Sequence, residues 1–193
     1  MAAAAPIFNE RGFAGTSMND ILTATGLEKG GVYRHFESKD ELAVAAFDYA
    51  VHALEARRRR ALQNANTALE RLYACIDVFG TSLQNPAVRG GCPLLNTAID
   101  ADDTHPALRE RARRAMLHWQ ELIADLVGDA KLNGELGVAA NSDVLVSVIT
   151  SSLEGAIMVS RLLRDSQHME RVVAHLRAWL SSYETPPSAM VSA

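Results

Sequence analysis

Four neighbouring polar side chains near residue 30 have the chemistry to hydrogen-bond nucleic acid. They are Lys29, Tyr33, Arg34 and His35, and they occupy a short helix predicted over 29–36. Ammonium, phenol and imidazole donors suit phosphate oxygens, so Lys29, Tyr33 and His35 are candidate phosphate contacts. A guanidinium pairs with the two acceptors of a guanine edge, which makes Arg34 the candidate for base recognition. The predicted chemistry is non-covalent recognition of double-stranded DNA.

Two adjacent glycines interrupt the same predicted helix. Gly30 and Gly31 each lower helix stability by about 1 kcal/mol relative to alanine. Without side chains at these positions, the helix backbone can approach DNA closely, and contacts made there offset the loss. A loose turn in place of a helix is the alternative explanation.

The elements that must position these residues carry start and stop signals. Ser17 with Asp20 forms a capping box that opens a helix over 18–25, and Gly26 ends it. The predicted core of this helix-turn-helix consists of Ile21, Leu22, Leu27, Val32 and Phe36. Such corners also occur in proteins that do not bind DNA, so a purely structural helix-turn-helix is the alternative.

The rest of the chain predicts an all-α fold. Ser38 with Glu41 repeats the capping box before a long helix over 39–61. Apolar periodicity predicts the other helices at about 2–8, 69–83, 92–100, 106–132, 143–164 and 169–183. Strand-like alternation and fixed-period repeats are both absent from the sequence.

The composition is that of a globular protein, with 48% hydrophobic and 22% charged residues and a net charge of −4. Residues 1–60 contain eight Lys or Arg and eight Asp or Glu, so DNA affinity must come from a few well-placed cations. Charged residues interrupt the long apolar stretches, which argues against a membrane span. The opening segment does not fit a signal peptide, and two cysteines without a disulfide pattern fit the reducing cytoplasm.

Five residues of the second half are candidates for contacting a small molecule: Cys92, Met116, Trp119, Glu154 and Met158. Cys92 lies at a predicted helix start, where a partly exposed thiol with a lowered pKa could sense electrophiles or oxidants; a buried, inert cysteine is the alternative. Glu154 could orient a polar ligand from an apolar helix, or lie on an exposed rim. The methionines and the tryptophan fit a packed core equally well.

The last two predicted helices indicate a homodimer. The segment 143–164 is apolar around most of its circumference and needs cover on several sides, and 169–183 carries one apolar stripe. Together they predict a four-helix bundle between two subunits. Completion of a monomeric core is the alternative.

Residues with metal-binding chemistry occur in two short groups. His118 with Glu121 is one, and Asp102, Asp103 and His105 form the other. Their spacing favours a solvated acidic turn over a metal site. Since the sequence contains no catalytic motif, we expect neither an enzyme nor a cofactor or bound metal.

The stretch 11–42 resembles the N-terminal domain of the TetR family of transcriptional repressors. The matching residues are Arg11-Gly12-Phe13, Thr16-Ser17, Asp20-Ile21, Gly26, Lys29-Gly30, Tyr33, His35-Phe36, Ser38-Lys39 and Glu41-Leu42. By this resemblance, the positions that contact phosphates are Ser17, Lys29, Tyr33, His35 and Lys39. Gly31 and Arg34 occupy the positions that face bases.

The resemblance implies a helix-turn-helix DNA-binding domain at 1–45, joined through the long fourth helix to an antiparallel helical ligand-binding and dimerisation domain at 46–193. It implies a homodimeric repressor with recognition helices about 34 Å apart. A small-molecule effector would release operator DNA by shifting that spacing through the helix that begins at Ser38. An activator or a ligand-independent regulator would share the motif.

The sequence departs from the family pattern at its start. Family members usually have a basic arm and a longer first helix before the position of Ala2. Loss of such an arm would weaken DNA binding. The alternative function is therefore a helical small-molecule-binding protein with a truncated or degenerate DNA-binding head.

Overall fold

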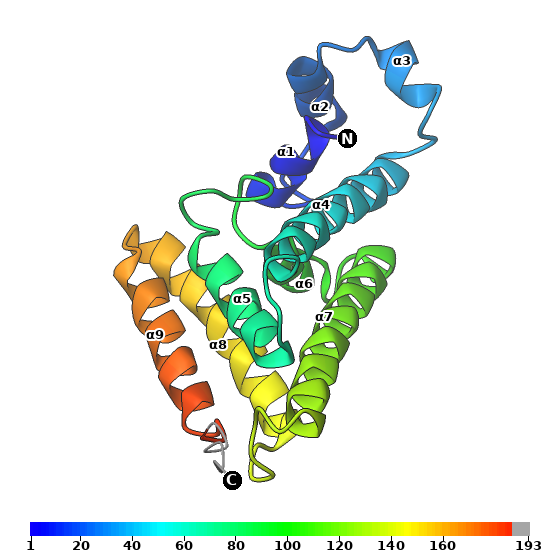
Figure 1. Cartoon of the computed structure of the whole chain (residues 1–193). Coiled ribbons are helices and arrows are strands. Elements are labelled where there is room, and N and C mark those ends of the chain that lie inside the picture. Colours follow the sequence, from blue (N-terminus) through cyan, green and yellow to red (C-terminus); the bar gives the residue numbers. More distant parts are fainter. Residues whose placement is uncertain (187–193) are drawn as a thin grey trace, which may run out of the picture.

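The computed structural model describes residues 1–186, and this part of the chain is helical, with a single isolated β-bridge (Figure 1). The helices are α1 (Ala4–Arg11), α2 (Met18–Thr25), α3 (Lys29–Tyr33), α4 (Lys39–Leu62), α5 (Ala68–Gly80), α6 (Pro93–Ala101), α7 (Pro106–Leu132), α8 (Ser142–Leu163) and α9 (Gln167–Ser181). The predicted all-α fold is confirmed. The last seven residues of the predicted domain 46–193 lie outside the described residues.

The first three helices form a small head (residues 1–45) at one end of α4 (Figure 1). Its buried apolar core contains Ala4, Ile21, Val32 and Leu42, with Phe8, Met18, Leu22 and Phe36 packed around it. The predicted capping box is present, since Ser17 Oγ accepts from the Asp20 amide at 3.1 Å and Asp20 accepts from the Ser17 amide at 2.8 Å. Gly26 ends α2 with a φ of 67°, a conformation that favours glycine.

Two sequence predictions about the head are wrong. Leu27 is 53% exposed and does not belong to the core of the head. The second helix of the motif ends at Tyr33, not at residue 36, and Arg34 to Phe36 form a turn after it. The physical reason is that α3 has two glycines and no side-chain cap at Glu28, so little beyond the burial of Val32 stabilises it.

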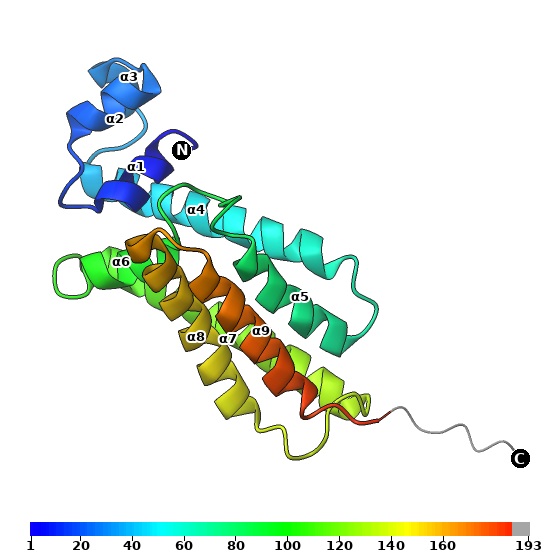
Figure 2. The same ribbon diagram turned by 90° about the vertical axis from the view of Figure 1, so that its left-hand side faces the viewer.

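Helix α4 runs without a break from the head into the rest of the molecule (Figure 2). Its 24 residues correspond to about 36 Å. Ser38 Oγ accepts from the Glu41 amide, as predicted, but the Glu41 carboxylate accepts from Glu37 and not from Ser38, so the predicted capping box is only half formed. The helix crosses the predicted domain boundary at 45/46 and makes one rigid element of both sides.

The remaining helices pack into a bundle (residues 46–186) around the C-terminal half of α4. Within it α5 packs against α4, α7 and α9, and α8 packs against α7 and α9. A capping box that the sequence analysis missed, Thr67 with Glu70, opens α5. The apolar stripe of α9 faces this core, with Met169, Leu176 and Leu180 fully buried.

Helix α8 is the most apolar element of the bundle. By length and composition alone, this helix would be long and apolar enough to cross a membrane. One face of it, including Leu145, Ile149 and Leu153, is buried against neighbouring helices of the same chain, and Glu154 is buried with them. That arrangement is the one expected of a core helix in a bundle.

Besides α4, a polar junction connects the head to the bundle. Asn9 of α1 donates to the carbonyls of Arg89 (2.8 Å) and Gly91 (3.2 Å), and Asn96 of α6 donates to the Asn9 and Gly90 carbonyls. Gly90 has a φ of 109°, and a Cβ there would lie 2.8 Å from the Asn9 backbone. The loop 89–92 is therefore held against α1 by hydrogen bonds that leave no room for a side chain.

Candidate DNA-binding surface and internal cavity

Helix α3, which carries Lys29 and Tyr33, lies at the end of the head farthest from the bundle (Figure 2). Lys29, Tyr33, Arg34 and His35 are exposed, on α3 and in the turn that follows it. Ser17 is exposed at the start of α2, and Lys39 begins α4. The predicted contacts are thus exposed or half-buried on the head, and their contact with DNA stays a prediction.

Local contacts orient several of these donors. The Lys29 ammonium lies 5.7 Å from the centre of the Tyr33 ring. The Lys39 ammonium lies 4.1 Å from the centre of the Phe13 ring, which in turn packs edge-on against His105 at the start of α7. Lys39 is thereby half-buried and fixed in direction, while Lys29 extends from an exposed helix.

Gly30 and Gly31 face open space. A Cβ built at either position would meet no atom of the chain within 4 Å, and neither residue has a positive φ. Packing and backbone conformation within the described chain therefore give no reason for glycine here. Close approach of a partner to the helix backbone is a reason that fits.

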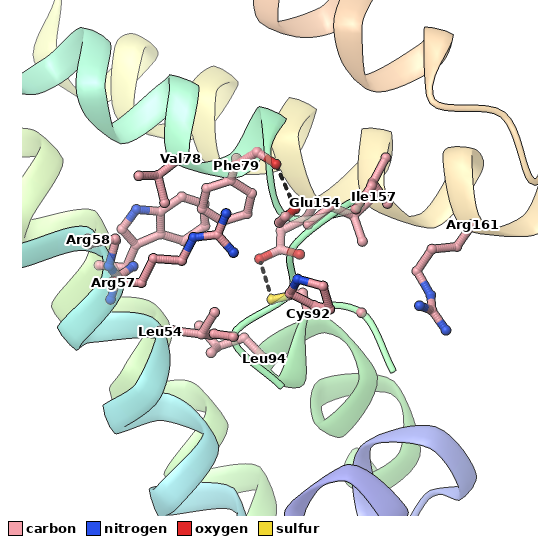
Figure 3. Close-up of a pocket in the computed structure, with 16 residues that line it drawn as sticks. Leu54, Arg57, Arg58, Val78, Phe79, Cys92, Leu94, Glu154, Ile157 and Arg161 are labelled. Carbon is pink, nitrogen blue, oxygen red and sulfur yellow. Dashed lines mark hydrogen bonds between the residues drawn. The ribbon is translucent and has the colours of Figure 1, made fainter. Parts of the chain in front are cut away.

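The bundle contains a cavity of about 60 Å³ beside the middle of α8 (Figure 3). Helices α4, α5, α6, α7 and α8 and the loop 82–92 contribute residues to its wall. The lining residues are Leu54, Arg57, Arg58, Val78, Phe79, Ser82, Leu83, Pro86, Ala87, Gly91, Cys92, Leu94, Trp119, Glu154, Ile157 and Arg161. An apolar wall with a few convergent polar groups is typical of a small-molecule site.

Three buried polar side chains of this wall have unsatisfied atoms. Within residues 1–186, Arg58 Nε, Trp119 Nε1 and Glu154 Oε2 have no hydrogen-bond partner. The other Glu154 oxygen accepts from the Cys92 thiol at 3.1 Å (Figure 3). The Trp119 ring stacks on Phe79 at 4.7 Å, and the Arg58 guanidinium lies 5.8 Å from the Trp119 ring centre. Because buried polar groups are normally paired, these atoms make the cavity a candidate ligand site.

Burial controls the ionisation of the cavity. It raises the pKa of Glu154 to about 7, although the Cys92 hydrogen bond and the Arg58 charge act in the opposite direction. Burial also raises the pKa of the Cys92 thiol well above its ordinary value, and the Glu154 charge adds to this effect. The Cys92 thiol is therefore protonated at neutral pH, whereas Glu154 is about half protonated there and largely protonated below it.

The structure brings three of the five predicted ligand residues together, namely Cys92, Trp119 and Glu154. Met116 and Met158 lie outside the cavity lining, and Met158 is 49% exposed one helical turn after Glu154. The prediction of a partly exposed Cys92 thiol with a lowered pKa is wrong, because the thiol is buried and faces a carboxyl group. The exposed-rim alternative for Glu154 is likewise wrong, since only 7% of it is exposed.

Arg58 is the functional candidate that the sequence analysis missed. It sits in a run of four arginines that ends α4, and a basic run at a helix C-terminus is usually solvated. The available signal was its spacing: Phe47, Val51, Leu54 and Arg58 follow at intervals of four, three and four, so Arg58 continues the buried stripe of α4.

Two members of the groups with metal-binding chemistry make other contacts in the described structure. His105 accepts from the Leu108 amide through Nδ1 and so caps the start of α7. Asp102 pairs with Arg109 at 3.6 Å. Within residues 1–186, His, Cys, Asp and Glu side chains do not gather in threes in a way that would hold a metal ion.

Comparisons with known proteins agree with this architecture. The model for bacterial regulatory proteins of the tetR family matches residues 1–46, and the model for the tetracyclin repressor-like C-terminal domain matches residues 68–176. A crystal structure of a TetR transcriptional regulator from Chloroflexus aurantiacus J-10-FL superimposes with a TM-score of 0.91 at 43% identity, covering 95% of this chain and 92% of that one.

Two curated relatives extend the comparison. An uncharacterised HTH-type transcriptional regulator of Mycobacterium tuberculosis is 30% identical over 188 residues, which are 92% of this chain and 90% of that protein. The HTH-type transcriptional repressor DhaR of Mycobacterium sp. strain GP1 is 22% identical over 166 residues, 86% of this chain and 82% of DhaR. The chain belongs to the TetR family and is a DNA-binding transcriptional regulator.

The open surroundings of Gly31 generate a prediction with two readouts. Gly31→Ala should raise the free energy of unfolding by up to about 1 kcal/mol, because alanine favours the helix. The same methyl group should weaken binding to operator DNA about tenfold or more. Urea denaturation at fixed protein concentration and DNA titration measure the two effects. Gly128→Ala, in open space on α7, is the matched control and should leave DNA binding unchanged. Unaltered DNA affinity in Gly31→Ala would refute the close approach.

The raised pKa of Glu154 generates a pH prediction. In the unfolded chain this carboxyl titrates near 4.3, but in the folded chain it holds its proton to about pH 7, so ionisation destabilises the fold as the pH rises between these values. Glu154→Gln removes the ionisable group and therefore this pH-dependent loss of stability. Its unfolding free energy should gain about 2–3 kcal/mol over the wild type between pH 5 and pH 8. Glu121→Gln, at an exposed position, is the control and should show no such pH-dependent gain. If the difference in unfolding free energy between Glu154→Gln and the wild type does not change with pH, the raised pKa of Glu154 is contradicted.

Proposed function

We propose that this TetR-family regulator acts in the cytoplasm as a homodimeric repressor that a small-molecule effector releases from operator DNA. The observation that carries the proposal is the continuity of α4. One end of this helix holds Lys39 in the head, and the other end places Leu54, Arg57 and Arg58 in the cavity wall. A ligand that moves the cavity end therefore moves the DNA-binding end.

The head supplies two kinds of contact in this proposal. Ser17, Lys29, Tyr33, His35 and Lys39 bind phosphates and set the position of the head on the duplex. Arg34 reads a base edge, and the bare backbone at Gly30 and Gly31 lets the short helix enter the major groove. The small number of cations means that placement, not bulk charge, provides the affinity.

Repression is favoured over activation by two considerations. A dimer that covers an operator blocks transcription by occupancy alone, and DhaR, which aligns along most of this chain, is named a transcriptional repressor. Release then requires that the effector bind the non-operator geometry more tightly than the DNA-bound geometry.

The proposed dimer forms through α8 and α9, in the segments 143–164 and 169–183. One face of α8 is uncovered within the chain and carries apolar or small residues at intervals of four and three. They are Val144, Val148, Ser151, Gly155, Met158 and Leu162. Exposed Ala174 and Ala178 give α9 a surface of the same kind. This spacing suits packing of two helix pairs about a twofold axis, and it gives the exposed Met158 a role in the interface.

The DNA contacts are tested by Tyr33→Ala and Lys39→Ala. Each should weaken binding to the operator by about tenfold, and loss of a phosphate contact should reduce the slope of log affinity against log salt by about one. Titration of operator and scrambled duplex at several salt concentrations measures this. Tyr49→Ala, an exposed tyrosine farther along α4, is the control and should bind like the wild type. Equal weak binding of the wild type to both duplexes would instead support a helical small-molecule-binding protein with a degenerate head.

The dimer is tested by Ser151→Arg. Ser151 is exposed and lies at the middle of the uncovered α8 face, so the change leaves the core intact but brings two buried charges together at the twofold axis. The dimer dissociation constant should rise by about 100-fold or more, as measured by sedimentation. Leu132→Arg, at an 87% exposed position ending α7, should remain dimeric. A Ser151→Arg protein that stays dimeric would place the interface elsewhere.

A further inference from the structure

The polar groups of the cavity wall are biased toward donors. Arg58 is 8% exposed and Trp119 is 1% exposed, and each has a nitrogen without a hydrogen-bond partner within residues 1–186. Arg58 also takes part in none of the ion pairs among these residues, although the guanidinium always carries its charge. The charges of Glu55 and Glu154 act on Arg58, but neither carboxyl group forms an ion pair with it. A buried cation without an ion-pair partner is costly, so this wall favours a negatively charged occupant.

The balance of charged side chains in the lining also favours a negatively charged occupant. Arg57, Arg58 and Arg161 line the cavity, against a single carboxyl group, Glu154. The Arg57 guanidinium is occupied, because it donates to the Asn85 carbonyl and to Thr81 Oγ1. Arg161 is exposed, and its guanidinium points away from Cys92 and Glu154 (Figure 3). Arg58 is thus the buried cation of the lining that is left for a ligand.

The remaining wall is suited to an apolar body. Leu54, Val78 and Ile157 line it together with the stacked rings of Phe79 and Trp119. The free space of about 60 Å³ is small for a ligand site, so the ligand that fits with least rearrangement is small. A multiply charged phosphate would leave these apolar groups without a partner and ask for more donors than two.

We propose that the cavity binds a small monocarboxylic acid with an apolar body, its carboxylate held by Arg58 and the Trp119 N–H and its hydrocarbon part lying against Phe79 and Ile157. The uncharged Glu154 carboxyl group supplies a further donor to the ligand. This inference rests on the proposed function, because it takes the effector to be the molecule that fills the cavity. The recognition pairs a buried cation with an anion and avoids a second negative charge.

Protonation of Glu154 then governs affinity. The groups that face Glu154 are Cys92 from the segment before α6 and Arg58 from α4, while α5 and α7 present the rings of Phe79 and Trp119. Glu154, with its pKa of about 7, is uncharged at pH 6 and ionised at pH 8, where it repels a carboxylate and competes for Arg58. If only the protonated form binds the acid, its affinity falls about tenfold between pH 6 and pH 8.

The experiment is calorimetric titration of the full chain, without DNA, using butyrate and benzoate as acids, benzamide as a neutral probe and benzylamine as a cation, at pH 6 and pH 8. We expect one or both acids to bind, to bind about tenfold more weakly at pH 8, and to bind more tightly than the amide or the amine. Tighter binding of benzylamine, increasing with pH, would assign the site to cations and overturn the proposal. Equal binding of benzamide and benzoate, or binding of neither acid, would overturn it as well.

Two variants assign the effect to residues. Arg58→Met keeps the length and apolar stem of the side chain, and should lower acid affinity about 30-fold or more; Arg59→Met, exposed on the same helix, should not change it. Glu154→Gln should bind the acid equally at both pH values. Retained affinity in Arg58→Met, or an unchanged pH dependence in Glu154→Gln, would contradict the proposed contacts.

Failure here is distinguishable from failure of the proposed function. Selective operator binding by a protein that ignores every acid would overturn the ligand class and leave the DNA-binding function standing. If the protein binds acids with the expected pH dependence and variant effects but does not bind the operator selectively, the ligand class is supported. The proposed repressor function is then overturned.

Discussion

The free-energy cost of removing charged groups from water is the main constraint on the core of the bundle. Arg58 and Glu154 are both more than nine-tenths buried, yet no hydrogen bond or ion pair joins them. Burial favours the neutral carboxyl group, whereas the guanidinium has no neutral form to adopt. The core therefore retains one uncompensated positive charge, and it lies on α4, the helix that carries the head. Stability of the bundle depends on how that charge is satisfied, and so, in the proposed function, do ligand preference and movement of the head.

The head meets the opposite constraint, because it must recognise a polyanion with few cations. Residues 1–60 are balanced in charge, and Asp20 of the head pairs with Arg11 at 2.9 Å. Recognition then depends on the fixed directions of a few donors and on a short helix whose backbone is left bare at Gly30 and Gly31. The same bare backbone makes α3 a weak helix that owes its place to Val32 against Ile21 and Leu42. A weak recognition helix is acceptable where the DNA itself completes the packing.

Much of this arrangement was predictable from local signals. Capping residues, glycine stops and 3.6-residue periodicity located every helix, because these effects act over a few neighbouring residues. Errors arose where tertiary packing decides. Leu27 is apolar but has no neighbour to cover it, Cys92 starts a helix but is covered by α8, and Arg58 is charged but lies on the buried stripe of α4. Periodicity placed Trp119 and Glu154 on helices, but only the crossing of four helices brings them to one cavity.

Two connections link the cavity to the head, and they constrain each other. The first is α4; the second is the loop 89–92, where Gly91 and Cys92 line the cavity while Gly90 and Gly91 hydrogen-bond to α1 through Asn9 and Asn96. Since α1 itself packs on α4 through Ala5, Ala46 and Ala50, the head cannot follow one connection without the other. A ligand that displaces only Cys92 strains the loop against α1. Movement of Arg58 and Cys92 together turns α1 and α4 as one body, and such a rotation changes the spacing of two heads in a dimer without unfolding either.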